Sequence, residues 1–421
     1  MNSTGTDDPV IIVGSGIIGL ATAWHLSMRG RSVLVIDQET PTGSASRGNA
    51  GILSLGHPPL TQPGASIKGL RWMFNRNSPF WIRPRLDPKL LQWLLNFHRH
   101  CRRDHLEACM PALSELGAQS IGWYEQMVRD HSIDCHWDRR GWLDVCRSEP
   151  ALEQARRTAE MLKGHGFDST VLENGRLQEL DPAYRDDLAG AVRYEDSATM
   201  DPSAFLHGLE QACRDRGVRF DHQARLERVQ LGDHAISGIH LEDGRNIACS
   251  SLLVAAGIWS SQVASSIGIK IPMQAARGYH LQLRLDSSMP CIGSVLNESC
   301  VAVTPMGDQL RLAGTLEITS INAPISRRRL DQLVRAASLY IRDIDGATRE
   351  GEWAGLRPCT WDGIPVIGGV PWIDGLFIAT GHAMMGMTLG PATGRVMADL
   401  ITGTDPDLDL SMFTADRFGR A

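Results

Sequence analysis

Three glycines near the N-terminus have the spacing of a phosphate-binding turn. Gly14, Gly16 and Gly19 follow four apolar residues, 10–13, that predict a buried parallel strand. In such a turn the first glycine allows a tight bend, the second lets the backbone approach a pyrophosphate, and the third allows a helix to pack closely on the strand. The pyrophosphate then lies at a helix N-terminus, where backbone N–H groups favour negative charge.

The elements that must position this turn can also be predicted from the sequence. Residues 20–29 have the pattern of a helix, and residues 31–36 that of a second strand, which ends at Asp37. A carboxylate at this place accepts hydrogen bonds from ribose hydroxyls and repels a ribose 2′-phosphate. The sequence therefore predicts a Rossmann-like α/β domain that binds FAD or NAD rather than NADP.

The composition is that of a globular protein long enough for two domains. The chain has 421 residues, of which 43% are hydrophobic and 21% charged, and its net charge of -6 predicts no general attraction to nucleic acid. The nine cysteines lack C-x-x-C spacing, and no metal-ligand spacing or Ser/His/Asp arrangement is evident. The polar first eight residues do not resemble a signal peptide, and no apolar run of 18 residues follows. These features predict a cytoplasmic protein without a metal.

A glycine-rich segment near the C-terminus favours a flavin. Residues 376–379 predict a buried strand, and residues 391–402 predict a helix that follows the segment 381–390. A helix N-terminus stabilises negative charge, which a flavin gains at its N1–C2=O edge when it is reduced, whereas nicotinamide gains none. The pattern therefore favours FAD over NAD.

Four motifs in this order resemble the D-amino-acid oxidase family of flavoproteins, and most of all its bacterial D-amino-acid dehydrogenase branch. The likeness extends over about residues 9–418. The motifs are Gly48-Asn49-Ala50-Gly51, Lys68-Gly69-Leu70-Arg71-Trp72-Met73-Phe74, Arg277-Gly278-Tyr279 and Gly355-Leu356-Arg357-Pro358.

The resemblance implies an α/β fold with a discontinuous, glutathione-reductase-type FAD domain and a mixed-sheet α+β substrate domain. The FAD domain would comprise residues 1–56, 195–268 and 355–421, and the substrate domain residues 57–194 and 269–354. Local patterns agree with this division. They predict helices over residues 201–216 and 327–341, strands over residues 219–222, 251–257, 279–284 and 309–313, and a hairpin over residues 227–242.

The resemblance also implies which residues bind FAD. No cysteine occurs in residues 381–394, where a flavin tether could have been suspected, so the FAD is expected to be non-covalent. His382 is expected to lie near the cofactor rather than to act as a base. The implied cofactor-binding residues are Gly14, Ser15, Gly16, Ile17, Ile18, Gly19, Asp37, Gln38, Ser46, Arg47, Gly48, Asn49, Ala50, Gly51, Val229, Ala256, Gly257, Gly355, Arg357, Gly381, His382, Gly386, Met387, Thr388 and Leu389.

Two residues are expected to contact the substrate. The resemblance implies that Arg357 binds a substrate carboxylate, and a planar guanidinium suits this role because it can donate two parallel hydrogen bonds. The alternative is a structural arginine paired with an acid. Tyr279 and His280 point to opposite faces of a strand, so only one can face the cavity. The resemblance favours Tyr279, for which the alternative is a packed tyrosine with a satisfied hydroxyl.

These residues imply dehydrogenation of a D-amino acid to an imino acid, which water converts to a 2-oxo acid. Arg357 would fix the carboxylate and hold the α C–H over flavin N5, and the electrons would pass to a quinone or another respiratory acceptor. Two alternatives are open. One is a secondary-amine oxidase or dehydrogenase that acts on D-proline, hydroxy-D-proline, sarcosine, glycine or glyphosate, and the other is a redox-sensing flavoprotein without catalysis.

Residues 64–103 combine basic and aromatic side chains. The segment contains nine Lys or Arg, three Trp and three Phe against the single acid Asp87, and residues 89–99 predict an amphipathic helix. This composition is typical of interfacial membrane contact, and a quinone is delivered from a bilayer. The protein could therefore lie on the inner face of the cell membrane. The alternative is that the aromatic residues form ordinary core beneath a solvated basic face.

Overall fold

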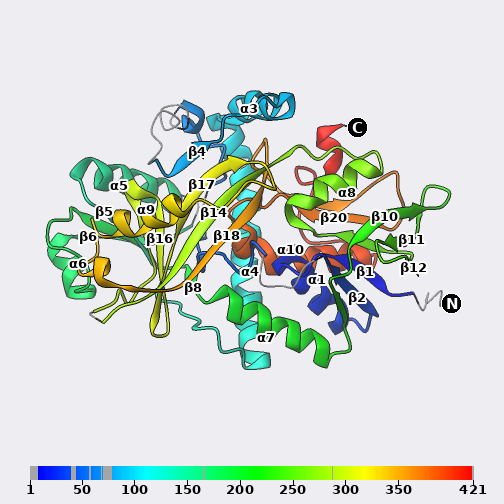
Figure 1. The fold of residues 1–421 in the computed structure, drawn as a ribbon, viewed down its shortest axis with the longest axis horizontal. Coiled ribbons are helices and arrows are strands. Elements are labelled where there is room, and N and C mark those ends of the chain that lie inside the picture. Colours follow the sequence, from blue (N-terminus) through cyan, green and yellow to red (C-terminus); the bar gives the residue numbers. More distant parts are fainter. Residues whose placement is uncertain are drawn as a thin grey trace.

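A computed structural model describes residues 8–38, 44–55, 58–67, 69, 78–164, 166–286 and 288–419 of the chain. Two large β-sheets lie side by side, and the long helix α4 (Arg103–His131) runs between them (Figure 1). The six-stranded sheet carries the glycine turn. The nine-stranded sheet stands opposite it, so the region between the sheets is where a site can form.

The six-stranded sheet has the order β19-β20-β13-β1-β2-β9. Its strands are parallel except β19, which runs antiparallel to β20. The strands are β1 (Val10–Val13), β2 (Val33–Asp37), β9 (Arg219–His222), β13 (Leu252–Val254), β19 (Val366–Gly369) and β20 (Leu376–Thr380).

Alternate residues of β1 pack against two different layers. Val10 and Ile12 belong to the core formed with α1 (Ile17–Met28), α4, α7 (Pro202–Asp215) and α10 (Gly386–Ile401). Ile11 and Val13 belong to a second core, on the other face. This face is covered by α8 (Ser260–Ser266) and by a three-stranded sheet of β10 (Leu226–Leu231), β11 (Ile236–Leu241) and β12 (Asn246–Ala248). Burial on both faces explains why the strand is continuously apolar.

The nine-stranded sheet has the order β18-β14-β17-β16-β15-β5-β7-β6, and β4 pairs with β17. Helix α9 (Arg327–Ala337) packs on one face of this sheet and contributes to the core there. The strands are β4 (Phe80–Ile82), β5 (Trp142–Cys146), β6 (Ser169–Glu173), β7 (Gly190–Tyr194), β14 (Met273–Arg284), β15 (Ser294–Leu296), β16 (Val301–Met306), β17 (Gln309–Thr319) and β18 (Thr348–Thr360).

The remaining helices and short strands lie outside the two large sheets. The small two-stranded sheet of β3 and β8 lies where the chain passes between the large sheets. The elements are β3 (Ile52–Leu53), β8 (Ala198–Thr199), α3 (Pro88–His100), α5 (Glu149–Lys163), α6 (Asn174–Leu180), η2 (Gly257–Trp259), η3 (Asn297–Ser299), η4 (Ile344–Gly346) and η5 (Ala415–Phe418). None of the described helices is both long and apolar enough to cross a bilayer.

Most predicted elements are confirmed, and the largest correction concerns α10. The strand over residues 219–222 has the predicted bounds, and Asp201 caps α7 by accepting hydrogen bonds from two backbone N–H groups. Helix α10 begins at Gly386 rather than at Pro391, so the proline lies inside the helix. The predicted strands starting at 279 and ending at 313 are longer, and α9 ends at residue 337 rather than 341.

The six strands of the first large sheet come from residues 10–37, 219–254 and 366–380, which fall within the three segments expected for an FAD domain. The positions of the domain boundaries stay a prediction. Of the four motifs behind the resemblance, residues 68 and 70–74 lie outside the described residues.

Candidate functional site

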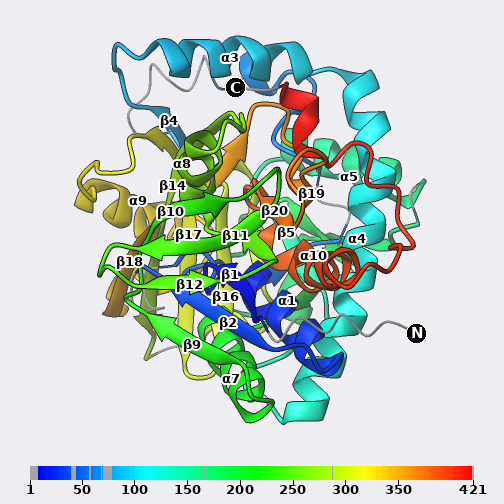
Figure 2. The ribbon, with the colours of Figure 1, turned by 90° about the vertical axis from the view of Figure 1, so that its right-hand side faces the viewer.

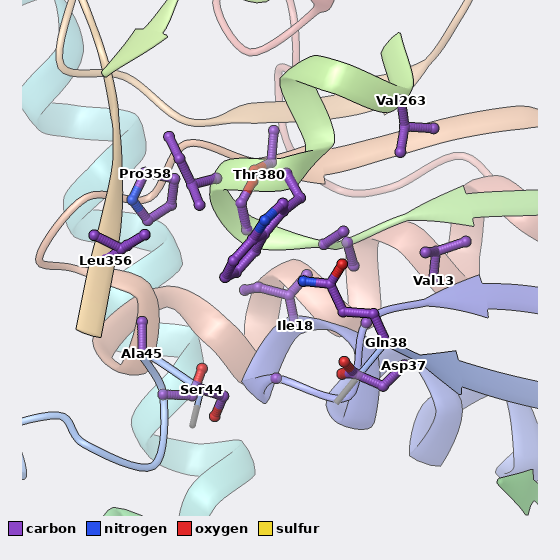
Figure 3. Close-up of a pocket in the computed structure, with 18 of the residues that line it drawn as sticks. Val13, Ile18, Asp37, Gln38, Ser44, Ala45, Val263, Leu356, Pro358 and Thr380 are labelled. Carbon is purple, nitrogen blue, oxygen red and sulfur yellow. Dashed lines mark hydrogen bonds between the residues drawn. The ribbon is translucent and has the colours of Figure 1, made fainter. Parts of the chain in front are cut away.

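A cavity of about 390 Å³ lies between the two sheets. In Figure 3, Leu356 and Pro358 of β18 stand on one side of it, and Asp37 and Gln38 at the end of β2 stand on the other. The first turn of α1, the loop from residue 44 to 49, the start of β10 and the face of α8 complete its wall. Its lining thus extends from the three-stranded sheet, past the glycine turn, to the nine-stranded sheet.

The glycine turn has the geometry that a pyrophosphate site requires. Gly14 has φ +112°, and a Cβ there would lie 2.5 Å from the carbonyl oxygen of Ala255. A Cβ at Gly19 would lie 1.9 Å from the carbonyl oxygen of Gly14. Neither position can hold a side chain, so the tight turn and the close packing of α1 on β1 require glycine there, and Gly14 and Gly16 line the cavity at the start of α1.

Ser15 fixes the orientation of Asp37. The backbone N–H and the hydroxyl of Ser15 both donate to Asp37 Oδ2, each over 2.7 Å. Asp37 lines the cavity and Ser15 does not. The carboxylate is thereby held beside the glycine turn, where a ribose would follow the pyrophosphate.

Most of the predicted cofactor-binding residues line this one cavity. They are Gly14, Gly16, Ile17, Ile18, Asp37, Gln38, Ser46, Gly48, Asn49, Val229, Ala256, Gly257, Arg357, Gly381, His382, Gly386 and Met387.

The other predicted residues do not line the cavity, and several have a different role. Arg47 forms an ion pair with Glu210 over 3.2 Å. Thr388 and Leu389 line a separate cavity of about 10 Å³ beside α4. Gly355 leaves room for the indole of Trp353, since a Cβ there would lie 2.0 Å from the ring. The residues that the structure does not bring to the cavity are Ser15, Gly19, Arg47, Ala50, Gly51, Gly355, Thr388, Leu389 and Tyr279.

The sequence analysis missed one face of the helical segment after β13. Trp259, Gln262, Val263 and Ser266 all line the cavity. Their spacing of i, i+3, i+4 and i+7 is that of one helix face. This spacing, directly after a predicted strand that ends in glycine, was a signal that could have found them.

Arg357 lies in the cavity wall without an acidic partner. Its Nη1 donates to the carbonyl oxygen of Thr315 over 2.9 Å, and among the described residues no carboxylate forms an ion pair with it. Burial lowers the pKa of the guanidinium from its usual value. A half-buried cation that faces a cavity without a counter-charge costs free energy, so an anionic ligand would be stabilised here.

Gly278 makes the room for this guanidinium. It pairs with Gly355 across β14 and β18, and a Cβ at Gly278 would lie 2.5 Å from Cζ and from both terminal nitrogens of Arg357. The glycine in the Arg277-Gly278-Tyr279 motif is therefore a steric requirement of the arginine on the neighbouring strand.

The expectation that Tyr279 faces the cavity is not supported by the geometry. Tyr279 is fully buried in the core that includes Leu330 and Leu333 of α9, and its hydroxyl donates to Glu317 over 2.6 Å. The opposite face of the strand carries His280, which stacks on Trp353 and lies 3.0 Å from the carbonyl oxygen of Gly48. The alternative of a packed tyrosine thus describes this residue.

His382 lines the cavity as a neutral histidine. It is 3% exposed, and its Nε2 lies 3.2 Å from the hydroxyl of Thr393. Burial lowers its pKa to about 3. A histidine with this pKa is a poor proton acceptor at neutral pH, in agreement with the expected role near the cofactor.

The donor and acceptor groups of the site fit FAD. A glycine turn at a helix N-terminus and a carboxylate after the second strand suit the pyrophosphate and ribose. The first turn of α10, with Gly386 and Met387, lines the same cavity as Arg357. Among the residues that the structure describes, no group of three or more potential metal ligands occurs. Fold and site together define a dinucleotide-dependent oxidoreductase with two facing sheets.

The comparisons with known proteins identify the family. The model of the DAO family, "FAD dependent oxidoreductase", matches residues 9–400, and the chain belongs to this family. A D-amino acid dehydrogenase of Xylella fastidiosa is 32% identical in an alignment of 403 residues that covers 93% of this chain and 91% of that protein. The expected family, fold class and FAD dependence are thereby confirmed.

Solved structures share the fold over nearly the whole chain. Glycine oxidase from Bacillus cereus superposes with a TM-score of 0.76 at 20% identity, covering 95% of this chain and 96% of the oxidase. L-proline dehydrogenase from P. horikoshii has a TM-score of 0.74 at 16% identity, covering 98% of this chain and 97% of the dehydrogenase.

Proposed function

We propose that the protein catalyses FAD-dependent dehydrogenation of D-amino acids to imino acids, which water hydrolyses to 2-oxo acids. The single observation that carries this proposal is Arg357. A half-buried guanidinium in the cavity wall, with one carbonyl partner and no acid partner in the described part of the chain, is suited to bind a substrate carboxylate through two parallel hydrogen bonds. The 32% identity with a protein named D-amino acid dehydrogenase supports the choice of substrate class.

In the proposed complex the chain holds FAD along the cavity. The backbone of the glycine turn would bind the pyrophosphate, Asp37 a ribose, and residues of β10 and α8 the adenine end, without a covalent bond to the flavin. When bound, FAD supplies a two-electron acceptor for the substrate α-hydrogen. His382 has too low a pKa to take a proton from the amine, so the substrate is proposed to react with its amine already neutral.

A secondary amine is the second candidate substrate. The neighbours in fold include an enzyme named L-proline dehydrogenase, whose name implies a cyclic secondary amine. A secondary amino acid presents the same carboxylate to Arg357, so the arginine alone does not separate the secondary amines D-proline, hydroxy-D-proline, sarcosine and glyphosate, or the achiral glycine, from primary D-amino acids.

We expect the purified protein to be yellow with FAD that acid precipitation releases, and D-amino acids to bleach it. The test is anaerobic absorbance of the bound flavin during titration with a panel of D-amino acids and their L-enantiomers. Bleaching by D-enantiomers supports the proposal. Bleaching by sarcosine or D-proline alone supports the secondary-amine alternative. If no amine bleaches the flavin, a redox-sensing flavoprotein without catalysis becomes the better description.

For the electron acceptor we propose a quinone, reached from a membrane on which the outer face of α3 lies. Figure 2 shows α3 along one edge of the molecule. Leu91 and Leu95 are one helical turn apart and are 60% and 54% exposed, and Leu86, just before the helix, is fully exposed. Exposed leucines next to basic residues are typical of helices that lie in a membrane interface.

The charges around α3 suit an anionic bilayer. Asp87 is the only acid in residues 78–103, and it is engaged as the N-cap of α3 and in an ion pair with Arg85. The exposed basic residues of the segment are Arg83, Lys89, Arg99, Arg102 and Arg103.

The described aromatic residues of this segment are buried or half-buried, unlike the exposed leucines. Trp93 is 4% exposed, stacks on Phe97 and donates its indole N–H to the carbonyl oxygen of Cys359 over 3.0 Å. Phe80 and Trp81 belong to β4, which pairs with β17. Trp93, Phe80 and Phe97 share one hydrophobic cluster and Trp81 is half-buried, so the leucines carry the exposed apolar surface.

We expect the protein to sediment with phosphatidylglycerol vesicles at low salt and to be released by high salt. Each Lys or Arg near the surface contributes about 1 kcal/mol, which salt screens. The double variant Leu91→Ser/Leu95→Ser should bind the vesicles several-fold less and turn over a soluble dye at the parent rate. The matched control is Leu231→Ser/Leu339→Ser, because these leucines are also exposed and lie on other elements. A protein that ignores vesicles at every salt concentration would contradict the membrane contact, and rapid peroxide release would identify dioxygen as the acceptor.

A further inference from the structure

Helix α10 contains a proline that removes one of its hydrogen bonds. The helix begins at Gly386, and Pro391 is its sixth residue. A proline has no backbone N–H, so the carbonyl of Met387, four residues earlier, loses its donor within the helix. An unsatisfied carbonyl in a buried helix is costly, so another group must bond to it.

Tyr124 of α4 supplies the missing donor. Its hydroxyl donates to the carbonyl oxygen of Met387 over 2.7 Å, and its side chain is fully buried. Burial raises the pKa of Tyr124 well above its usual value, so the hydroxyl stays protonated. One turn earlier on α4, Ser120 accepts a hydrogen bond from the N–H of Ala392 over 3.1 Å. Helix α4 thus contacts α10 through polar groups on both sides of the proline.

The turn that Tyr124 holds is the part of α10 that lines the cavity. Gly386 and Met387 are lining residues, and the carbonyl that accepts the bond belongs to Met387 itself. The first N–H groups of a helix lack partners within it and favour negative charge, and this preference depends on their distance from the ligand. A shift of this turn would therefore change how strongly the helix stabilises a charge on the flavin.

We propose that Tyr124 is a positioning residue for the flavin, which replaces the hydrogen bond that Pro391 cannot make and so fixes the first turn of α10 against the cofactor. The inference rests on the proposed FAD site and does not depend on which amine is the substrate. Tyr124 does not line the cavity, and its hydroxyl bonds to the backbone of Met387, which does.

The test compares the holoenzyme of Tyr124→Phe with that of Tyr184→Phe. Tyr184 is also fully buried, and its hydroxyl donates over 2.7 Å to Ser294, in the core of the nine-stranded sheet. Both variants lose one buried tyrosine hydroxyl, so both are expected to lower the melting temperature. Only Tyr124→Phe should weaken FAD binding about tenfold. It should also favour the oxidised flavin about tenfold, which lowers the flavin midpoint potential by about 30 mV for a two-electron couple.

The measurements are the FAD dissociation constant and the flavin midpoint potential, by dye equilibration with dithionite. Neither uses an amine, so a failure of D-amino acids to bleach the flavin would reject the proposed substrate without touching this inference. A flavin potential in Tyr124→Phe equal to that of the parent would overturn the positioning role.

A rescue variant keeps the inference testable if Tyr124→Phe folds poorly. Pro391→Ala restores a backbone N–H at position 391, which can donate to the carbonyl of Met387 within the helix. The double variant Tyr124→Phe/Pro391→Ala should therefore bring the potential back toward that of the parent. If the double variant is shifted as far as the single one, or if Tyr184→Phe shifts the potential equally, the effect is general loss of packing and the proposal is wrong.

Discussion

Replacing Arg357 by lysine should lower kcat/KM for D-amino acids by about 30-fold to 1000-fold, and leave FAD bound. Lysine keeps the charge but presents a point-like ammonium, which cannot donate two parallel hydrogen bonds to a carboxylate. A loss of about 2 to 4 kcal/mol in transition-state stabilisation is the usual scale for weakening a buried, hydrogen-bonded charge pair.

The surroundings of Arg357 explain why the effect should be large. The guanidinium donates to the carbonyl of Thr315, and no carboxylate of the residues that the structure describes pairs with it, so the substrate would supply the missing counter-charge. Gly278→Ala is an independent way to disturb the same group, because the new Cβ would come within 2.5 Å of three guanidinium atoms. It should produce a similar loss without changing the arginine itself.

The measurement is steady-state kinetics with a dye as acceptor, together with binding of a carboxylate inhibitor followed through the flavin spectrum. Arg349→Lys is a matched control on the same strand, since Arg349 pairs with Asp331 at the surface. An Arg357→Lys variant that binds the inhibitor as tightly as the parent would show that another residue holds the carboxylate.

The parts of the site that were predictable from sequence are local. Gly14, Gly19 and Asp37 have roles that depend on the strand, turn and helix in which they lie. These elements follow one another within about 30 consecutive residues, so their spacing can be recognised in the sequence. The structure accordingly places Gly14 and Asp37 in the lining of the cavity, with Gly19 packed against the carbonyl oxygen of Gly14 beside them.

The parts that were not predictable depend on contacts between distant segments. Residues 275–283 of β14 are buried on both faces, so alternation along the strand could not tell whether Tyr279 or His280 faces the cavity. The start of α10 was placed too late because a proline normally begins a helix. What overrides this rule is the hydroxyl of Tyr124, which lies 263 residues before its partner Met387.

Acidification from pH 7 to pH 5 should lower the free energy of unfolding by about 4 to 5 kcal/mol through four buried groups. Burial lowers the pKa of His25, His280 and His382 to about 3 each, from an ordinary value of 6.5. Between these values the unfolded chain binds more protons than the folded one, so stability falls as the pH falls. Between pH 7 and pH 5 each of these histidines lowers the free energy of unfolding by about 2 kcal/mol.

Protonation of Asp144 raises the free energy of unfolding as the pH falls, opposite to the effect of the histidines. Burial raises its pKa to about 6, so the folded protein binds its proton more readily and recovers about 1.3 kcal/mol between pH 7 and pH 5. Carboxylates with lowered pKa values, such as Asp138 and Glu298, lose their contribution only below the ordinary carboxyl range. The interval from pH 6.5 to pH 5 therefore reports mainly on the histidines.

Urea unfolding at pH 7 and pH 5, with saturating FAD at both, measures the change. His25→Gln should reduce the pH dependence by about 2 kcal/mol, because it removes one of the three buried neutral histidines while leaving the cavity intact. The matched control is His207→Gln on α7, which makes the same substitution at an exposed histidine and removes no buried group. An unfolding free energy that is equal at the two pH values would mean that these histidines gain their protons in the folded protein as readily as in the unfolded chain, which their burial and their surroundings oppose.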